Sequence, residues 1–135
     1  MEAIGSILEP YIYNIQKVLK AIKKKRIKSK DDAVTFLREN NIEFLSCGST
    51  RIVFLNCDKT KVIKIAINAY GIASNVQEYL KSENDLKERY AKVYFKSKKS
   101  RVMLCEYCKE ISGSLYGVNK NGKNVLLDYS NIGID

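Results

Sequence analysis

Hydrophobic residues near the N-terminus recur three and four positions apart, the spacing that places them on one side of an α-helix. The stripe consists of Ile4, Ile7, Leu8, Tyr11, Ile12, Ile15, Val18, Leu19 and Ile22. Pro10 marks the expected start of the helix, because a first turn tolerates its missing N–H. Ser29 is the expected N-cap of a second helix over Lys30–Asn40, with Asp31 and Asp32 in its first turn. Residues 1–41 are therefore predicted to form a helical hairpin with a basic connection.

From residue 44 onward the pattern changes to short β-branched and apolar runs, which predict strands. Phe44–Leu55 predicts two strands around a small-residue turn, and Lys61–Ile67 predicts a third. Gly71–Arg89 is polar with apolar residues at helical spacing, so a helix is expected to follow the third strand, with Ser74 or Asn75 as its N-cap.

Two further hairpins are predicted in the second half of the chain. Ala91–Phe95 is expected to pair with Arg101–Glu106, and Ser114–Val118 with Val125–Asp128. No internal repeat or low-complexity linker interrupts this order of elements. The sequence therefore favours a single α+β domain over residues 1–135.

Basic residues are concentrated in one segment. The 135 residues include 24 Lys plus Arg and 15 Asp plus Glu, a net charge of +9, and residues 17–30 hold eight of the basic residues and no acidic one. Such a segment on a nearly neutral body indicates either a solvated helix face or a local anion-binding surface. The candidate surface consists of Lys17, Lys20, Lys23, Lys24, Lys25 and Arg26. We expect the apolar stripe of this helix to pack on the sheet and the lysines to point outward.

Composition excludes several classes of protein. The chain has no His, so triads, relays and zinc sites that need imidazole are excluded. No run approaches the roughly 18 apolar residues that cross a bilayer, and the N-terminus lacks the pattern of a signal peptide. No membrane span and a cytoplasmic location are expected.

Four cysteines, Cys47, Cys57, Cys105 and Cys108, allow two disulfides, a metal site or four small buried side chains. A reducing cytoplasm disfavours disulfides. A zinc site would require Cys47 and Cys57 to converge on the Cys105–Cys108 pair, although both lie in apolar, strand-like contexts. We expect buried thiols.

One lysine stands in the middle of an apolar strand. Lys64 lies within Val62–Ala66, and a buried lysine needs a partner. Glu78 follows in the next predicted helix, and a strand Lys held by a helix Glu is an arrangement that directs an ammonium group at nucleotide phosphates. The alternative is an ion pair that only ties strand to helix. Upstream, Gly48 and Ser49 form a small-residue turn that either allows backbone N–H groups to approach an anion or closes an ordinary hairpin.

Four other polar residues have open interpretations. Arg51, beside this turn, either contacts an anion or points to solvent, and solvent is the expectation. Glu106 and Glu110 are expected at the surface. Asp128, at the end of an apolar strand, is either a turn residue or a metal ligand.

Residues 42–130 resemble the N-terminal lobe of the protein-kinase-like fold, in particular the short kinase-like proteins, or pseudokinases, of phages and their bacterial hosts. Ser46–Phe54 resembles the Gly-rich loop with its second strand, and Met103–Cys108 the fifth strand and hinge. Asn121–Ser130 is similar to the hairpin that leads into the Asp-Phe-Gly magnesium motif. Beside the helical hairpin extension predicted over 1–41, the resemblance implies an antiparallel N-lobe-like sheet with one C-type helix over 42–112 and the hairpin before the magnesium motif over 113–135. The C-terminal lobe is essentially absent.

The resemblance also implies a binding site. Lys64 looks like the lysine of the third strand, and Glu78 like the glutamate of helix C. Gly48 and Ser49 correspond to the phosphate-binding loop, and Asp128 to a magnesium ligand. ATP and Mg²⁺ are the cofactors that the resemblance implies.

The sequence also departs from the kinase pattern. Ser46 stands at the first loop glycine and Ser130 at the last glycine of the magnesium motif. Only 21 residues separate Glu106 from Asp128, too few for the catalytic loop, and no Asp or Asn lies at positions 108–117. The predicted function is a catalytically incomplete kinase-like module, encoded by a phage or mobile element, that acts by binding a phage or host protein. The alternatives are a minimal phosphotransferase completed by a partner and a nucleic-acid-binding regulator that uses the basic helix.

Overall fold

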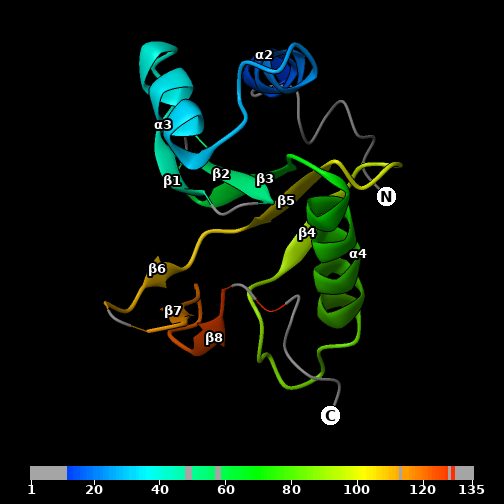
Figure 1. Cartoon of the computed structure of the whole chain (residues 1–135). Coiled ribbons are helices and arrows are strands. Elements are labelled where there is room, and N and C mark those ends of the chain that lie inside the picture. The colour runs from blue at the N-terminus through cyan, green and yellow to red at the C-terminus, as the bar shows by residue number, and fades with distance from the viewer. Residues whose placement is uncertain (1–11, 48–49, 57–58, 113, 128, 130–135) are drawn as a thin grey trace.

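The computed structural model describes residues 12–47, 50–56, 59–112, 114–127 and 129. In these residues it contains the helices α2 (Ile12–Lys23), α3 (Lys30–Glu39) and α4 (Ala69–Glu83). The strands are β1 (Phe44–Cys47), β2 (Arg51–Leu55), β3 (Lys61–Ala66), β4 (Val93–Lys96), β5 (Val102–Glu106), β6 (Lys109–Glu110), β7 (Tyr116–Val118) and β8 (Asn124–Leu126). The fold is of the α+β class, as the sequence predicts (Figure 1).

Five strands form an antiparallel sheet in the order β1-β2-β3-β5-β4. The central strand β3 is hydrogen-bonded to β2 on one side and to β5 on the other. Because successive side chains of a strand point to opposite faces, β3 sends Ile63 and Ile65 to one face and Val62 and Lys64 to the other. The sheet is thus divided into an apolar face and a face that carries a charge.

Helices α2 and α3 cover the apolar face (Figure 1). Their buried side chains pack against sheet residues in one cluster of Ile15, Val18, Ala21, Ile27, Ala33, Leu37, Ile42, Ile52, Phe54, Ile63, Ile65, Val102 and Leu104. The predicted packing of the apolar stripe on the sheet is therefore confirmed. The Ser29 hydroxyl accepts a hydrogen bond from the Asp32 N–H at 3.2 Å, which confirms the predicted cap of α3.

Helix α4 lies on the opposite face, and its N-cap differs from the prediction. The Asn68 side chain, in extended backbone geometry directly after β3, accepts a hydrogen bond from the Gly71 N–H at 3.0 Å. The predicted caps, Ser74 and Asn75, lie inside the helix, which ends at Glu83 rather than extending to residue 89. Asn68 can cap the helix because its extended backbone lets the side chain turn back to a free N–H of the first turn. Ser74 and Asn75 lie beyond that turn, so their side chains cannot reach its N–H groups.

The first turn of α4 approaches β2 closely at Gly71. A Cβ at this position would lie 2.1 Å from the Thr50 carbonyl oxygen and 3.0 Å from the Cβ of Ala66. Any other residue would therefore push the helix away from the sheet.

Strands β6, β7 and β8 form a second, three-stranded sheet below the first (Figure 1). The predicted hairpin of β7 and β8 is confirmed, and Gly122 adopts a φ of 77° in its turn. The pairing of the two-residue strand β6 with β7 was not predicted. Val125 packs with Ala91, Cys108 and Tyr129 in a small cluster that joins this sheet to the rest of the molecule.

None of the helices in the described part of the chain is long and apolar enough to cross a membrane.

Candidate functional site

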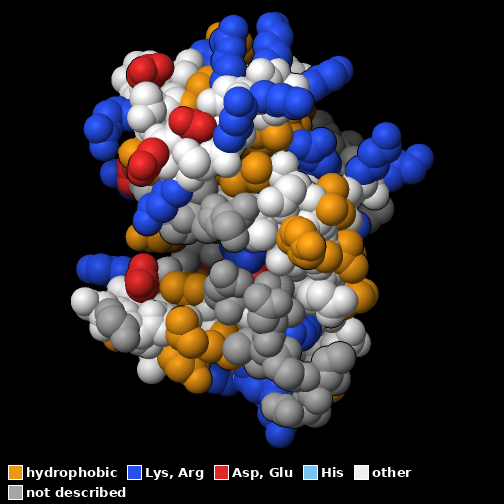
Figure 2. All heavy atoms as spheres, viewed as in Figure 1, with side chains coloured by type: hydrophobic (Ala, Val, Ile, Leu, Met, Phe, Trp, Pro, Cys, Tyr) orange, Lys and Arg blue, Asp and Glu red, His pale blue; other side chains and the backbone are white. Residues whose placement is uncertain are grey.

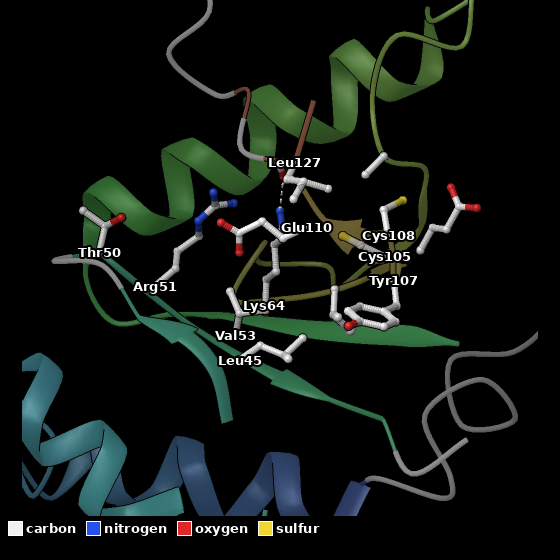
Figure 3. A pocket seen from close by; sticks show the side chains of 13 residues that line it. Leu45, Thr50, Arg51, Val53, Lys64, Cys105, Tyr107, Cys108, Glu110 and Leu127 are labelled. Carbon is white, nitrogen blue, oxygen red and sulfur yellow. Dashed lines mark hydrogen bonds between the residues drawn. The ribbon is translucent and has the colours of Figure 1, made fainter. Parts of the chain in front are cut away.

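A hollow of about 220 Å³, here called the cleft, opens on the α4 side of the five-stranded sheet (Figure 3). Leu45, Val53 and Val62 of the sheet form an apolar wall, and Leu127, just after β8, closes the cleft from the second sheet. At one end the lining residues are Thr50, Arg51 and Lys64, and at the other they belong to Cys105–Cys108 and β6. The cleft therefore combines an apolar slot with a basic end.

The predicted pair of Lys64 and Glu78 forms. The Lys64 Nζ donates to Glu78 Oε1 at 2.9 Å, so β3 is joined to α4. Lys64 is 7% exposed and Glu78 is 0% exposed. Lys64 also donates to the Leu127 carbonyl oxygen at 3.1 Å, which links the two sheets across the cleft (Figure 3).

Arg51 is buried, contrary to the prediction that it points to solvent. Its guanidinium holds Glu78 through two parallel hydrogen bonds, Nη1 to Oε1 at 2.8 Å and Nη2 to Oε2 at 2.7 Å. Nη1 also donates to Asn75 Oδ1 at 3.2 Å, and Asn75 Nδ2 donates to the Ser100 carbonyl oxygen at 2.8 Å. A buried guanidinium requires such partners, and these partners lie on α4, more than twenty residues away in sequence.

The segment after β8 also donates a hydrogen bond to Glu78. The Tyr129 N–H donates to Glu78 Oε2 at 3.2 Å, so the carboxylate accepts hydrogen bonds from three different residues. Tyr129 itself is fixed on all sides: its hydroxyl donates to the Ala91 carbonyl oxygen at 2.7 Å, its ring stacks on Tyr90, and its own carbonyl oxygen accepts from Lys81 Nζ at 2.8 Å. Burial raises the pKa of Tyr129 far above its ordinary value. The chain next to Asp128 is thereby held against α4.

The opposite end of the cleft is formed by the segment after β5. Glu106 is 8% exposed, so its predicted surface position is wrong, whereas Glu110 is exposed as predicted. Glu106 Oε2 accepts from the Lys120 N–H at 3.2 Å, which ties this segment to the turn between β7 and β8. The thiols of Cys105 and Cys108 are free and buried, and burial raises the pKa of Cys105 to about 11 and that of Cys108 to about 12.

Several predicted site residues lie outside the described part of the chain. These are Gly48, Ser49 and Asp128, together with Cys57. Among the residues that are described, no three His, Cys, Asp or Glu side chains are grouped so that they could hold a metal ion.

The basic segment lies on the far side of the sheet from the cleft. Lys17, Lys20, Lys24 and Arg26 line one side of a second hollow, of about 510 Å³, between α2 and α3, and Asp32 and Glu39 lie among the residues of α3 that complete it. Figure 2 shows Lys and Arg side chains gathered over this end of the molecule. The outward orientation predicted for the lysines is confirmed for Lys20, Lys23, Lys24 and Lys25, which are exposed.

Neither the protein-family models nor the curated proteins include a match to this chain.

The side chains around the cleft fit some groups of a nucleotide complex better than others. An apolar slot suits a planar base, and Lys64 and Arg51 suit phosphate oxygens. At the basic end of the cleft, the described carboxylate of Glu78 is unsuited to Mg²⁺, which requires oxygen ligands, because it already accepts four N–H bonds from Arg51, Lys64 and Tyr129.

Proposed function

We propose that this chain is a nucleotide-binding module resembling a kinase N-terminal lobe, which does not itself transfer phosphate and acts through a protein partner. The observation that carries the proposal is the position of Lys64, which is held by a buried glutamate of α4 at the basic end of an apolar cleft. A base in the slot between Val53 and Leu127 would direct its phosphates toward Lys64.

The arrangement of the elements supports this reading. A five-stranded antiparallel sheet with one helix between its third and fourth strands is the organisation that the resemblance implies. The hydrogen bond between Lys64 of the third strand and Glu78 of that helix also supports the proposal. The chain between Glu106 and the hairpin of β7 and β8 is a short connection with one two-residue strand. It contains neither the Asp that accepts a proton from the substrate hydroxyl in protein kinases nor the Asn that binds their second metal ion.

A surface on the second sheet supports a protein partner. Four hydrophobic side chains are exposed on or beside β6 and β7, namely Ile111, Leu115, Tyr116 and Val118. Figure 2 shows hydrophobic side chains gathered over this part of the molecule. Exposed apolar patches of this kind mark protein–protein contacts.

Thermal unfolding with ATP tests the nucleotide-binding proposal. A ligand that binds only the folded state raises the midpoint, by about 2.7 kcal/mol of stabilisation at a concentration 100 times its Kd. We expect ATP, with Mg²⁺ or with EDTA, to raise Tm by several degrees in the wild type and to have little effect on Lys64→Ala.

The structure provides a matched control and a reason why Lys64→Ala should fold. Arg51 keeps both oxygens of Glu78 occupied when Lys64 is removed. Lys61 lies on the same strand but contacts the Tyr94 ring at 5.5 Å and does not line the cleft. Lys61→Ala should keep the full ATP response. An ATP response that survives in Lys64→Ala, or that is missing from the wild type in both buffers, would refute the proposal.

A second candidate function uses the basic segment to bind a nucleic acid. In the described part of the chain no carboxylate forms an ion pair with Lys17, Lys20, Lys23, Lys24, Lys25 or Arg26. A surface of unpaired cations binds phosphates with an affinity that falls steeply with salt. Lys20→Gln/Lys24→Gln should weaken binding to a single-stranded oligonucleotide and reduce its salt dependence without changing Tm. Binding that is absent at low salt excludes this candidate.

A further inference from the structure

The hollow between α2 and α3, here called the α2–α3 groove, is lined by one stripe of residues from each helix. The stripe of α2 and the turn after it lies at positions 17, 20, 21 and 24, and the stripe of α3 at positions 32, 35, 36 and 39. Both have the spacing i, i+3, i+4, i+7 of one side of a helix. The Lys24 N–H donates to the Lys20 carbonyl oxygen at 2.9 Å, so this spacing holds to the end of the first stripe. Each stripe therefore covers two helical turns, about 10 Å.

The two stripes differ in charge. Basic side chains line the α2 side of the groove, and carboxylates lie on the α3 side, with the buried Ala21 and the half-buried Phe36 as an apolar part. The basic residues are Lys17, Lys20, Lys24 and Arg26, and the acidic residues are Asp32 and Glu39. Figure 2 shows both Lys or Arg and Asp or Glu side chains at this end of the molecule. The lining thus has more positive than negative charges, but it contains both.

The opposite charges do not meet across the groove. Within the described part of the chain, none of the four basic side chains forms an ion pair, and neither does Glu39. One oxygen of Asp32 accepts a hydrogen bond from the Lys28 N–H at 3.0 Å. The groove has a volume of about 510 Å³, within the range of about 300–1,000 Å³ that is usual for ligand sites. A ligand that carries charges of both signs could therefore contact both sides.

We infer that the α2–α3 groove binds a short acidic peptide segment of a protein partner. The carboxylates of the peptide contact the lysines of the α2 stripe, and one basic side chain of the peptide contacts Glu39. The inference rests on the part of the proposed function that assigns a protein partner to this chain. Complementary charges select and orient a partner, and an excess of basic residues in the lining selects a peptide with a net negative charge.

The α3 side of the groove favours a peptide over a nucleic acid. The backbone of a nucleic acid carries only negative charge, so Asp32 and Glu39 would repel it, whereas a peptide can supply charges of both signs. Single strands also need exposed aromatic rings on which bases stack. In the described lining the aromatic residue is Phe36, which packs against the apolar cluster under the helices. Tyr13 is exposed nearby, but it does not line the groove, and Lys17 Nζ lies over its ring at 4.6 Å.

Selection of peptides from a random library on the immobilised full chain, followed by fluorescence anisotropy with the selected peptides, tests the inference. We expect the enriched peptides to be net acidic and to contain a basic residue. Lys20→Gln/Lys24→Gln should weaken their binding about tenfold, because two charged contacts are lost. Lys23→Gln/Lys28→Gln is the matched control. It removes the same charge from exposed residues of the same segment that do not line the groove, and it should weaken binding by less than about twofold.

Glu39→Gln tests the contact on the α3 side. It should weaken binding of a selected peptide about twofold to threefold, because a charged pair at the surface is lost. The same peptide with its basic residue replaced by Ala should not be weakened by Glu39→Gln, since a double-mutant cycle isolates the contact between the two groups. A single-stranded oligothymidine should instead bind Glu39→Gln more tightly than the wild type, because a repulsive charge is removed.

The possible results separate this inference from the proposed function. Enriched peptides without an acidic bias, or equal losses in Lys20→Gln/Lys24→Gln and its control, overturn the groove as the docking site. Apolar peptides that no longer bind Leu115→Ser overturn it too, but keep a protein partner at the exposed patch of the second sheet. Binding of the oligothymidine without binding of any peptide overturns it in favour of a nucleic acid.

Nucleotide binding is measured separately in the same variants. The cleft lies on the opposite face of the sheet from the α2–α3 groove, so Lys20→Gln/Lys24→Gln should keep both the wild-type Tm and its increase with ATP. A library that yields no binding peptide, together with a normal ATP response, overturns the inference and leaves nucleotide binding in place.

Discussion

The two faces of the five-stranded sheet are built on opposite principles. The face toward α2 and α3 is sealed by a continuous apolar cluster that includes Leu37, Phe54 and Ile65. The face toward α4 buries the charged side chains of Arg51, Lys64 and Glu78. Apolar burial is non-directional and tolerates many combinations of side chains, whereas each buried charge depends on its particular partners. The first face supplies most of the stability, and the second fixes the relative positions of Arg51, Lys64 and Glu78.

Removing a large side chain from the apolar face should have the largest effect on stability. Phe54 is 1% exposed and lies in the centre of the cluster. Phe54→Ala should lower the free energy of unfolding by about 3–5 kcal/mol, because it removes apolar contacts and leaves a cavity. Urea unfolding measures this loss. Tyr70→Ala, which truncates an exposed aromatic on α4, is the control and should change the free energy by less than about 0.5 kcal/mol.

Glu78→Gln tests the charged face. The substitution keeps the size of the side chain but leaves Arg51 and Lys64 buried without their counter-charge. The expected loss in the free energy of unfolding is about 3 kcal/mol. Glu83→Gln, at the exposed end of the same helix, should be nearly neutral. If both variants unfolded at the same urea concentration, the fold would not depend on the negative charge of Glu78.

Gly71→Ala separates helix propensity from packing. Propensity alone predicts that Ala stabilises α4 by about 1 kcal/mol. The 2.1 Å approach of a Cβ to the Thr50 carbonyl oxygen predicts the opposite sign, a loss of about 1–3 kcal/mol in urea unfolding. Gln77→Ala, at an exposed position of the same helix, should be neutral or slightly stabilising. A stabilising Gly71→Ala would show that the helix can move away from the sheet at no cost.

The buried thiols predict a loss of stability at alkaline pH. The pKa values of Cys105 and Cys108 are raised by burial from 9.0 to about 11 and about 12. Above pH 9 the unfolded chain therefore releases these protons while the folded chain retains them, so the unfolded state binds fewer protons and stability falls as the pH rises. Urea unfolding between pH 8 and pH 10.5 should show this decline. Cys105→Ala/Cys108→Ala should show a smaller slope over the same range, and an unchanged slope would contradict the assignment.

Elements fixed by local chemistry were predictable from the sequence. Ser29 caps α3 through a residue three positions away, and the turn at residues 119–122 joins two short strands. The pair of Lys64 and Glu78 was also predictable, since a lysine in an apolar strand must find a counter-charge nearby in the fold.

The predictions that were wrong or missing concern residues whose positions depend on contacts with distant parts of the sequence. Arg51 stands at the start of a strand beside a small-residue turn, where an arginine is ordinarily solvated, and only the fold brings α4 to it. Glu106 is buried because the turn after β7 donates Lys120 N–H to it. Strand β6 has only two residues, too few to show the alternation of apolar and polar side chains that predicts a strand. It forms only because it pairs with β7.

The hydrogen bonds of Glu78 have a consequence for the order of folding. Its partners Lys64, Arg51 and Tyr129 are 14, 27 and 51 positions away in the sequence, and Lys64 reaches Leu127 over 63 positions. Contacts that close long loops are slow to form. The hairpins of β2–β3 and β4–β5 pair residues that are near neighbours in the sequence, so we expect them to form first. The Tyr129 N–H reaches the carboxylate only when residue 129 docks, so we expect the cleft to be among the last parts of the molecule to acquire its native structure.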